Sequence, residues 1–363
     1  MRLVSDGGLW STAPTAADVP LVAVLEVGGA VLSWVVDEDA GASPSITFTD
    51  PDRADWLWRV LGESGHVRLL DALSHRQPGQ SVDLPGVDVL PRTTNVLRRL
   101  AIGHWLRRWW PASDREGIAA LTRPVLDAEL ALLTVAAEDF FTDDTLDSDA
   151  AALLAPHMAD LNALAGQGDP RLAALVEDCR ELAGDIGLDW PETAAAAPRR
   201  DDYALAAGAA DGLNGTGSIA RGTATVPWSA VPPGVFDAAE NSLEWSVTAG
   251  SDGARAAVRV ALVGPDSPSG IEVELRHAGV HGSGALDAAG RAVVALHGPD
   301  GQPLTETEAW NVNWTGTAVR VGAAGATESA EARGRVRAFA RARLAAPGED
   351  GFLAEVLAAE SDY

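Results

Sequence analysis

The sequence predicts an α+β multidomain protein: a small α+β N-terminal unit and a helical bundle, then an immunoglobulin-like β-sandwich and a C-terminal helical tail. Apolar residues recur at helical spacing across 93–187, but alternate with polar residues across about 243–321. The stretch "PETAAAAPRRDD" between these regions has neither period. We therefore expect units at 1–80 and 81–190, a linker at 191–202, a β-sandwich at 203–325 and a tail at 326–363.

The N-terminal unit begins with residues that predict antiparallel strands. The segments "PLVAVLEV" and "AVLSWVVD" flank Gly28 and Gly29, which favours a two-residue hairpin, and "SITFT" predicts a third strand. Asp50 before Pro51 predicts a helix start, because the Asp side chain can cap and the first turn tolerates proline. We expect that helix to end near Gly62, and a second one to cover "HVRLLDALSHR".

Residues 93–187 predict a helical bundle. Its first helix, "VLRRLAIGHWLRRWW" at 96–110, is stopped by Pro111, and Ser113 with Glu116 predicts a capping box for the next helix. Three further helices are indicated by apolar positions at helical spacing: Leu126, Leu130, Leu133, Ala137 and Phe140; Leu153, Leu154, Met158, Leu161 and Leu164; and Leu172, Leu175, Val176, Cys179, Leu182 and Ile186.

The helix at 96–110 is rich in arginine and tryptophan but has no basic face. On a helical wheel Arg98 and Arg99 lie on one side and Arg107 and Arg108 on another, with apolar residues nearly all round. We expect a central core helix whose arginines extend over the core and pair with acids of neighbouring helices. A groove for a protein partner is the alternative; a nucleic-acid or membrane helix would gather its arginines together.

After the linker the hydrophobic period changes to two. Short alternating segments separated by Gly, Pro and Asp turns are typical of a β-sandwich of immunoglobulin-like or transthyretin-like pattern. The predicted strands are "LEWSVTA", "AAVRVALV", "IEVELR", "RAVVALH" and "TAVRVGA". Two helical segments, "EARGRVRAFARARLAA" and "FLAEVLAAE", follow them.

Composition and charge exclude several functions. The formal charge of -25 disfavours nucleic acid and anionic membrane surfaces as partners. All 27 basic residues are arginine, which indicates a GC-rich bacterial, actinobacterial genome and excludes chemistry that needs a lysine, such as a P-loop or a Schiff base. Without an apolar N-terminal run or a spanning segment, we expect a cytoplasmic protein.

The usual catalytic and metal-binding patterns are weak in this chain. Cys179 lies in a helical apolar stripe, so we expect a core residue. His277 and His281 lack an evident third ligand, "GTGSIA" at 215–220 lacks the strand and helix of a dinucleotide site, and "EDFFTDDTLDSD" at 138–149 lacks an EF-hand's Gly and Glu. We expect that acidic stretch to be a solvated loop in which Asp147 or Ser148 caps the next helix, and we expect no cofactor, no metal and no recognisable catalytic residue.

The C-terminal tail carries the candidate partner-binding residues. Arg333, Arg337 and Arg341 form a stripe at i, i+4 and i+8, and an acidic amphipathic segment follows "PGEDG". One interpretation is a helical hairpin in which arginines and acids face each other, or in which the arginines lie on the acidic body. The other is a docking peptide that enters a partner's groove through three apolar residues: Phe352, Val356 and Leu357.

These features favour a non-catalytic protein-interaction or scaffold protein, one subunit of a bacterial multi-protein system. The alternative is a hydrolase-like enzyme whose site is assembled between the helical bundle and the β-sandwich. A protein partner is expected, through the tail in the docking interpretation; the oligomeric state is left open.

Overall fold

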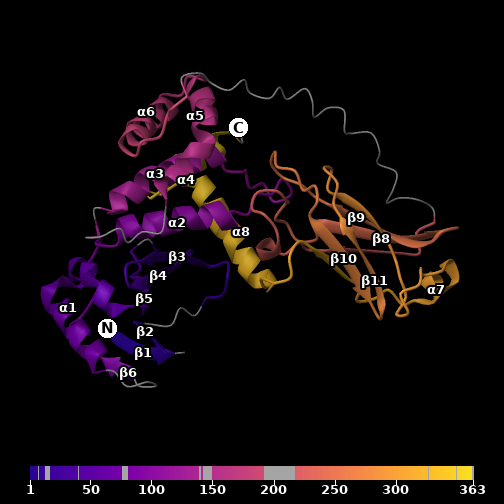
Figure 1. The fold of residues 1–363 in the computed structure, drawn as a ribbon, viewed down its shortest axis with the longest axis horizontal. Helices are drawn as coiled ribbons and strands as arrows, with labels where there is room; N and C mark the ends of the chain where they lie inside the picture. The colour runs from indigo at the N-terminus through magenta and orange to yellow at the C-terminus, as the bar shows by residue number, and fades with distance from the viewer. Residues whose placement is uncertain are drawn as a thin grey trace. The chain divides into compact units, whose positions relative to one another are not determined.

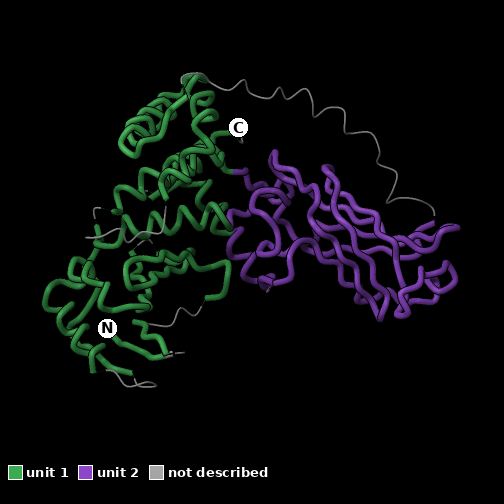
Figure 2. The backbone as a smooth tube through the Cα atoms, in the orientation of Figure 1, with its two compact units in different colours: residues 1–108, 121–197, 338–363 green, residues 109–120, 198–337 purple. Residues whose placement is uncertain are grey.

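The computed structural model describes residues 1–6, 8–12, 17–39, 41–75, 81–138, 140–141, 149–191, 217–325, 327–348 and 350–361 (Figure 1). Helices and antiparallel sheets together give a mixed α+β class, as the sequence predicts. The chain forms two compact units (Figure 2). Unit 1 comprises residues 1–108, 121–197 and 338–363, and unit 2 comprises residues 109–120 and 198–337. Most of the predicted linker at 191–202 lies outside the described residues.

Unit 1 contains a six-stranded antiparallel sheet in the order β3-β4-β5-β2-β1-β6. Its strands are β1 (Arg2–Asp6), β2 (Leu9–Ser11), β3 (Val22–Val27), β4 (Ala30–Val35), β5 (Ser45–Phe48) and β6 (Ser81–Asp83). Val27 pairs with Ala30 around the predicted two-residue turn. Gly29 has φ +73°, and a Cβ there would lie 2.1 Å from the Asp50 carbonyl oxygen, so glycine is required at this position.

The predicted helix start at Asp50 is confirmed only in part. The Asp50 side chain accepts a hydrogen bond from the Asp52 amide, but the turns that follow are the 3-10 helices η1 (Pro51–Arg53) and η2 (Asp55–Leu57). The α-helix α1 begins later and covers Trp58–Ser74. Gly62 interrupts it with φ 70° and ψ 162°, which confirms the expected break at this residue.

The segment 93–187, for which a helical bundle is predicted, contributes most of the helices of unit 1. Besides the helices above, unit 1 contains α2 (Asn95–Trp109), α3 (Arg123–Glu138), α4 (Ala150–Leu154), η3 (Ala155–His157), α5 (Met158–Ala165), α6 (Pro170–Asp185), α9 (Leu353–Ser361) and the second half of α8 (Ala330–Ala345). The side chain of Asp149 caps α4, and the predicted caps Asp147 and Ser148 lie outside the described residues. The prediction for Ile186 is wrong: it lies just after the end of α6, and its side chain is partly exposed.

Helix α2 is a central core helix, as expected from its apolar residues on all sides. Four of its apolar side chains are fully buried: Leu97, Leu100, Ile102 and Leu106. Its arginines pair with acids of other helices and the tail. Gly103 provides space for neighbours, because a Cβ there would lie 2.4 Å from Leu130 Cδ2.

The helix predicted after the capping box at Ser113 and Glu116 does not form. The Glu116 amide does donate to Ser113 Oγ at 3.1 Å, but Ser113 pairs with Ile118 as an antiparallel bridge. The Ser113 hydroxyl also donates to Asp237 of unit 2 at 2.7 Å, and Gly117 has φ +60°, which closes a turn where a helix would continue. Residues 109–120 therefore form a loop that belongs to unit 2.

Unit 2 contains two antiparallel sheets, of order β12-β9-β8-β7 and β11-β10-β13. The strands are β7 (Ala220–Ala224), β8 (Leu243–Gly250), β9 (Gly253–Val260), β10 (Glu272–His277), β11 (Val280–Ala285), β12 (Arg291–Ala295) and β13 (Ala318–Val321), accompanied by η5 (Trp228–Ala230) and α7 (Glu306–Asn311). The predicted alternation is confirmed, because Leu243, Trp245, Val247, Val258 and Leu275 belong to one buried cluster to which both sheets contribute.

Candidate functional site

The sheet β12-β9-β8-β7 has one face that takes no part in the hydrophobic cluster. Paired residues of neighbouring strands share a face, and successive residues of a strand alternate between faces. Thr223 pairs with Glu244, Glu244 with Arg259, and Arg259 with Arg291, so these four residues form one row across the sheet. We call the face that carries this row the arginine face; its residues are Arg221, Thr223, Glu244, Ser246, Thr248, Arg255, Ala257, Arg259, Arg291, Val293 and Ala295.

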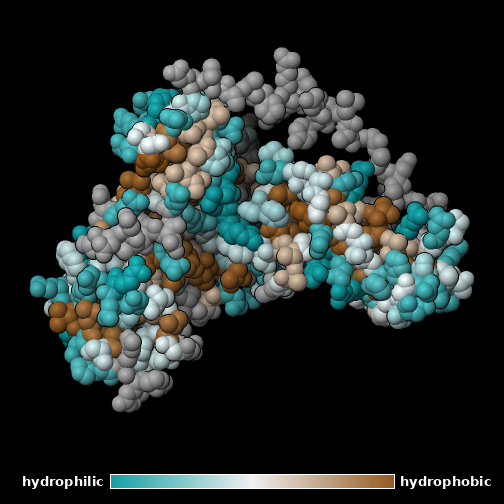
Figure 3. Space-filling view, viewed as in Figure 1, coloured by the Kyte–Doolittle hydropathy of each residue, from teal (hydrophilic) through white to brown (hydrophobic). Residues whose placement is uncertain are grey.

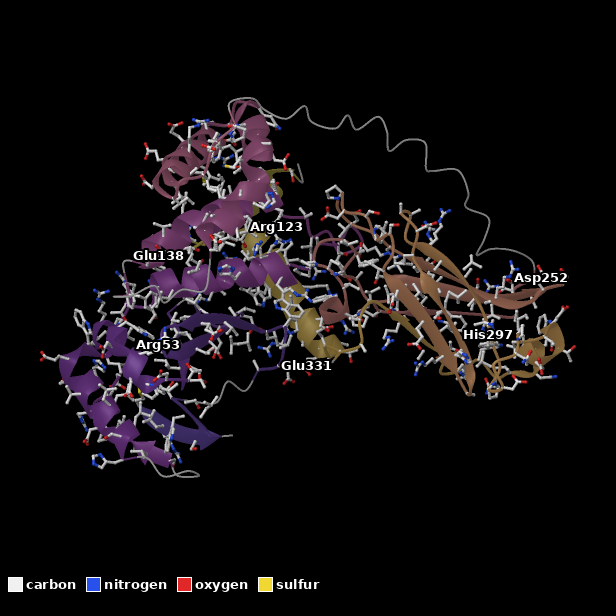
Figure 4. The ribbon with its side chains drawn as sticks, in the orientation of Figure 1. Arg53, Arg123, Glu138, Asp252, His297 and Glu331 are labelled. Carbon is white, nitrogen blue, oxygen red and sulfur yellow. The ribbon has the colours of Figure 1, made fainter. Side chains whose placement is uncertain are left out.

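The arginine face has the opposite charge to the chain as a whole. It carries four arginines and one glutamate, whereas the formal charge of the chain is -25. Arg255 forms an ion pair with Asp252 in the turn between β8 and β9, at 3.3 Å (Figure 4). Arg259 lies directly opposite a second arginine, Arg291. Like charges in directly paired positions of neighbouring strands are unfavourable.

A pocket of about 340 Å³ opens where this row meets the loop 109–120 of the same unit. Three guanidinium groups and one carboxylate line it, together with a hydroxyl and several apolar residues. The lining residues are Arg115, Ser242, Glu244, Arg259, Val260, Ala261, Leu262, Ala289 and Arg291. Its volume lies at the lower end of the range of small-molecule sites.

Hydrogen bonds to the buried Asp237 and to Asn241 position Arg115 at the pocket. The Asp237 carboxylate accepts from Ser113 Oγ at 2.7 Å, from the Ala239 amide at 2.9 Å and from the Arg115 amide at 3.3 Å. The Arg115 side chain donates to the Asn241 carbonyl at 3.1 Å and lies 4.0 Å from Glu244. The loop is thus anchored through a buried carboxylate, so Arg115 is held beside the arginines of the sheet.

Ser242 is an unusual residue of the pocket. It is only 1% exposed, and its hydroxyl has no hydrogen-bond partner in the described part of the chain. The backbone around it is ordered, because its carbonyl accepts from the Ala261 amide at 2.8 Å. A buried hydroxyl without a partner costs free energy, and a ligand oxygen in the pocket would recover it.

The arrangement suits binding of an anion more than transfer of a proton. Arginine remains protonated at all ordinary pH values and offers five N–H donors in a planar fork that matches carboxylate and phosphate oxygens. The apolar lining lowers the local dielectric, which strengthens such charged hydrogen bonds. Figure 3 shows apolar residues of unit 2 in small groups among hydrophilic ones on the visible face.

The predicted arginine stripe lies on α8 and is used within the chain. Arg333 forms a two-pronged ion pair with Glu240, with both N–O distances 2.8 Å, and Arg337 donates to Glu240 and to the Ala238 carbonyl. The hydrogen bond from Arg333 is the main cause that lowers the pKa of Glu240 to about 2. Arg341 is exposed. This agrees with the interpretation in which the arginines lie on acids of the body.

The apolar tail residues lie within unit 1. Phe352 is 0% exposed, with its ring next to Gly103, and Arg99 lies over that ring at 5.1 Å from the centroid. Val356 and Leu357 are half-buried. The structure thus places Phe352 in the core of unit 1, to which Arg341, Val356 and Leu357 also belong, whereas Arg333 and Arg337 belong to unit 2.

Acidic groups anchor the start of α9. Glu129 of α3 accepts hydrogen bonds from the Leu353 and Ala354 amides at 2.8 and 3.2 Å, which caps the helix. Burial nevertheless raises the pKa of Glu129. Glu355 is buried and forms a two-pronged pair with Arg343 at 2.5 and 2.6 Å. These contacts favour the interpretation in which arginines of α8 face acids of the tail.

Other titratable candidates are structural in character. Burial raises the pKa of the Cys179 thiol to about 12, so it is no nucleophile at neutral pH. Burial and the charge of Arg107 lower the pKa of His104 to about 4. His281 lies against His297, with ring centroids 5.8 Å apart, and the described residues contain no group of three His, Cys, Asp or Glu side chains that could hold a metal ion.

Asp127 is the centre of a buried ion cluster in unit 1. Its carboxylate accepts from Arg107 at 2.6 Å and from Arg123 at 2.9 Å (Figure 4), and it lies 3.1 Å from His157 Nε2. Burial acts to raise its pKa, but the hydrogen bonds from His157, Arg107 and Arg123 outweigh burial and lower it. The acid is therefore ionised and paired.

Sequence reasoning missed the arginine face and its pocket. The alternation of "AAVRVALV" places Arg255 and Arg259 on one side of a strand, which was a usable signal. The position of Arg291 beside Arg259 depends on the strand order, and Arg115 arrives from a segment predicted to be helical. The hydrophobic period of the sequence predicts neither the strand order nor the path of the segment that carries Arg115.

Comparisons with protein-family models, with curated proteins and with solved structures found no match. In the described part of the chain, no helix has both the length and the apolar character that crossing a membrane requires.

Proposed function

We propose that this chain is a non-catalytic interaction protein that binds an acidic partner protein through the arginine face of sheet β12-β9-β8-β7. The observation that carries the proposal is the local excess of arginine on this face within a chain of formal charge -25. Complementary charge guides encounter and selects partners, and arginine is enriched at protein interfaces. We further propose that the protein is cytoplasmic and one subunit of a bacterial multi-protein system.

The dimensions of the face favour an acidic protein segment over nucleic acid. Four strands about 4.8 Å apart give a positive strip of about 15 Å. A DNA duplex carries one charge per about 1.7 Å, so it would extend beyond this strip onto acidic surface and be repelled. A short acidic segment fits within the strip.

We infer that the two sheets of unit 2 pack face to face as an immunoglobulin-like sandwich. The shared hydrophobic cluster supports this, since the residues that face inward from both sheets contribute to it. Such a sandwich leaves the arginine face on its outside, available to a partner.

Reversal of charge on the arginine face tests the proposed function. The probe is a fluorescein-labelled peptide of consecutive glutamates, and the readout is its fluorescence anisotropy with the full chain. We expect Arg221→Glu with Arg255→Glu to weaken binding by about tenfold or more, because attraction becomes repulsion. Neither residue lines the pocket at Arg259.

The matched control is Arg276→Glu, an exposed reversal on β10 of the other sheet of unit 2. Each replacement, in the control and in the double variant, changes the net charge of the chain by the same amount. Because Arg276 lies on the other sheet, we expect the control to leave the affinity for the peptide within about twofold. If the control lost as much affinity for the peptide as the double variant, net charge alone would explain the loss. Specific binding at the arginine face would then be refuted.

A further inference from the structure

Strand β9 carries two arginines on the arginine face with a small residue between them. Successive residues of β9 on this face are Arg255, Ala257 and Arg259, because the side chains of a strand alternate between its two sides. Both arginines are exposed and Ala257 is partly exposed, whereas the alternate residues Ala256 and Val258 are buried. Neighbours in this series are about 6.8 Å apart, which is twice the rise per residue of an antiparallel strand.

An exposed valine lies beside this small residue. Ala257 pairs directly with Val293 of the neighbouring strand β12, so the two side chains share the arginine face. Val293 is 69% exposed, the highest value among the large hydrophobic residues of the described chain, and the exposed Ala295 follows it on the same face. We call Ala257, Val293 and Ala295 the apolar patch. A single exposed valine is ordinary on a protein surface, so the meaning of this patch depends on the charges around it.

The two arginines of β9 that flank the apolar patch can both reach a partner. Arg259 forms no ion pair among the described residues. Arg255 pairs with Asp252, but both side chains are more than half exposed, so this pair is weak and a partner's carboxylate can replace it. Arg291 already has a partner within the chain and is not needed for this contact. Glu244 lies opposite Arg259 on β8, away from β12, and so repels an acidic segment toward the apolar patch.

We infer that the acidic partner of this face carries an apolar residue midway between two acidic ones, in the order acid-x-apolar-x-acid. Side chains at alternate positions of an extended segment face the same side and are about 6.8 Å apart, which matches the spacing of Arg255, Ala257 and Arg259. The two carboxylates then lie over the arginines and the apolar side chain covers the apolar patch. This order is the same in both chain directions, so the orientation of the segment does not matter. The inference rests on the proposed function, because it takes the arginine face as the binding surface.

The apolar patch gives the face a means of distinguishing one acidic sequence from another. Ion pairs on an exposed surface are weak and are screened by salt, so charge alone discriminates poorly among acidic segments. Burial of apolar surface adds a contribution that does not depend on charge and is gained only where apolar groups meet. Recognition therefore depends on where the apolar residue stands among the acids.

The test compares three labelled peptides on the full chain by fluorescence anisotropy. The first is Glu-Thr-Glu-Thr-Leu-Thr-Glu-Thr-Glu, in which leucine and glutamates face one side of an extended chain. The second has serine in place of leucine, and the third exchanges the leucine with the threonine before it, so that leucine faces away from the glutamates. We expect the first peptide to bind about fivefold or more tightly than either of the others, because only its leucine covers the apolar patch while its acids lie over the arginines.

Val293→Thr locates the effect. Threonine has nearly the shape of valine and is also β-branched, and the position is exposed, so we expect the fold to be kept. The variant should reduce the preference for the first peptide over the second to about twofold or less, since a hydroxyl replaces a methyl group. Val24→Thr is the matched control, because Val24 is an exposed strand residue on β3 of unit 1, and it should leave the preference unchanged. A preference insensitive to Val293→Thr, or lowered equally by Val24→Thr, would overturn the inference.

The same measurements separate this inference from the proposed function. If the first and second peptides bind equally, and Arg221→Glu with Arg255→Glu still weakens both, the inference fails and the proposed function stands. If the third peptide binds as tightly as the first, the spacing has no role and the inference is wrong. If none of the three peptides binds, the proposed function fails together with the inference.

Discussion

Gly103 lies in α2 at a point where two neighbouring side chains of unit 1 leave no room for a Cβ atom. Leu130 of α3 and Phe352 of the tail both occupy the space where its Cβ would stand, with nearest atoms at 2.4 and 2.8 Å. Glycine in a helix interior costs up to about 1 kcal/mol relative to alanine, so its presence here reflects the close approach of these neighbours.

Gly103→Ala should lower the free energy of unfolding by about 1–3 kcal/mol, because the added methyl group displaces two buried side chains. Denaturation monitored by tryptophan fluorescence measures it. Gly184→Ala in α6 is the matched control, since a Cβ there meets nothing within 4 Å, and it should be neutral or slightly stabilising. Equal stability of the two variants would mean that Phe352 does not pack against α2.

Other residues show how far sequence reasoning reaches at this scale. Cys179 was expected in the core and is fully buried, because its place in a helical stripe is a local property. Ser113 was expected to start a helix, and its hydroxyl does accept from the Glu116 amide. The same hydroxyl also donates to Asp237, more than a hundred residues away in the chain, and no local pattern encodes that contact.

At the scale of elements, α9 is a part of unit 1 and not a free tail. Its first turn is capped by Glu129, its buried Glu355 pairs with Arg343, and Phe352 directly before it is fully buried. Its nine residues are too few for a stable isolated helix, so these contacts determine that it forms.

Deletion of residues 349–363 should therefore lower the melting temperature by about 10 °C, since it empties the Phe352 site and leaves buried Arg343 without its partner. Differential scanning calorimetry gives the value. Glu360→Gln tests the exposed end of the tail, where the ion pair with Arg171 contributes little, and should leave the melting temperature within about 2 °C. An unchanged melting temperature after the deletion would favour the docking-peptide interpretation.

Strands and helices were predictable from hydrophobic period, but their neighbours were not. The alternation in "LEWSVTA" and "AAVRVALV" indicates β8 and β9 and also which side faces the core. That β12 joins β9, and so places Arg291 beside Arg259, depends on pairing between strands separated by a hairpin from the other sheet. The candidate site forms only because β12 pairs with β9. Hydrophobic period does not indicate which strands pair, so the sequence does not predict the residues of this site.

At the scale of the whole molecule, 52 acidic residues outnumber 27 basic ones. Many arginines pair with acids, as at the buried Asp127 and Glu355 and the partly exposed Glu240. The arginine face carries four arginines and the single acid Glu244. The general acidity of the chain disfavours extended polyanions, which is why the proposed partner is a short acidic segment.

Photo-crosslinking of the glutamate peptide to the full chain, with the attachment sites read by mass spectrometry, tests the central claim most directly. The peptide carries a photoreactive group at one end and reacts with whatever lies beside it when bound. We expect the crosslinks to fall on β7, β8, β9 and β12, at residues such as Thr223, Thr248 and Val293, and to vanish when Arg221 and Arg255 are both replaced by Glu. Crosslinks concentrated on α9 around Val356 and Leu357, and insensitive to those replacements, would contradict the account.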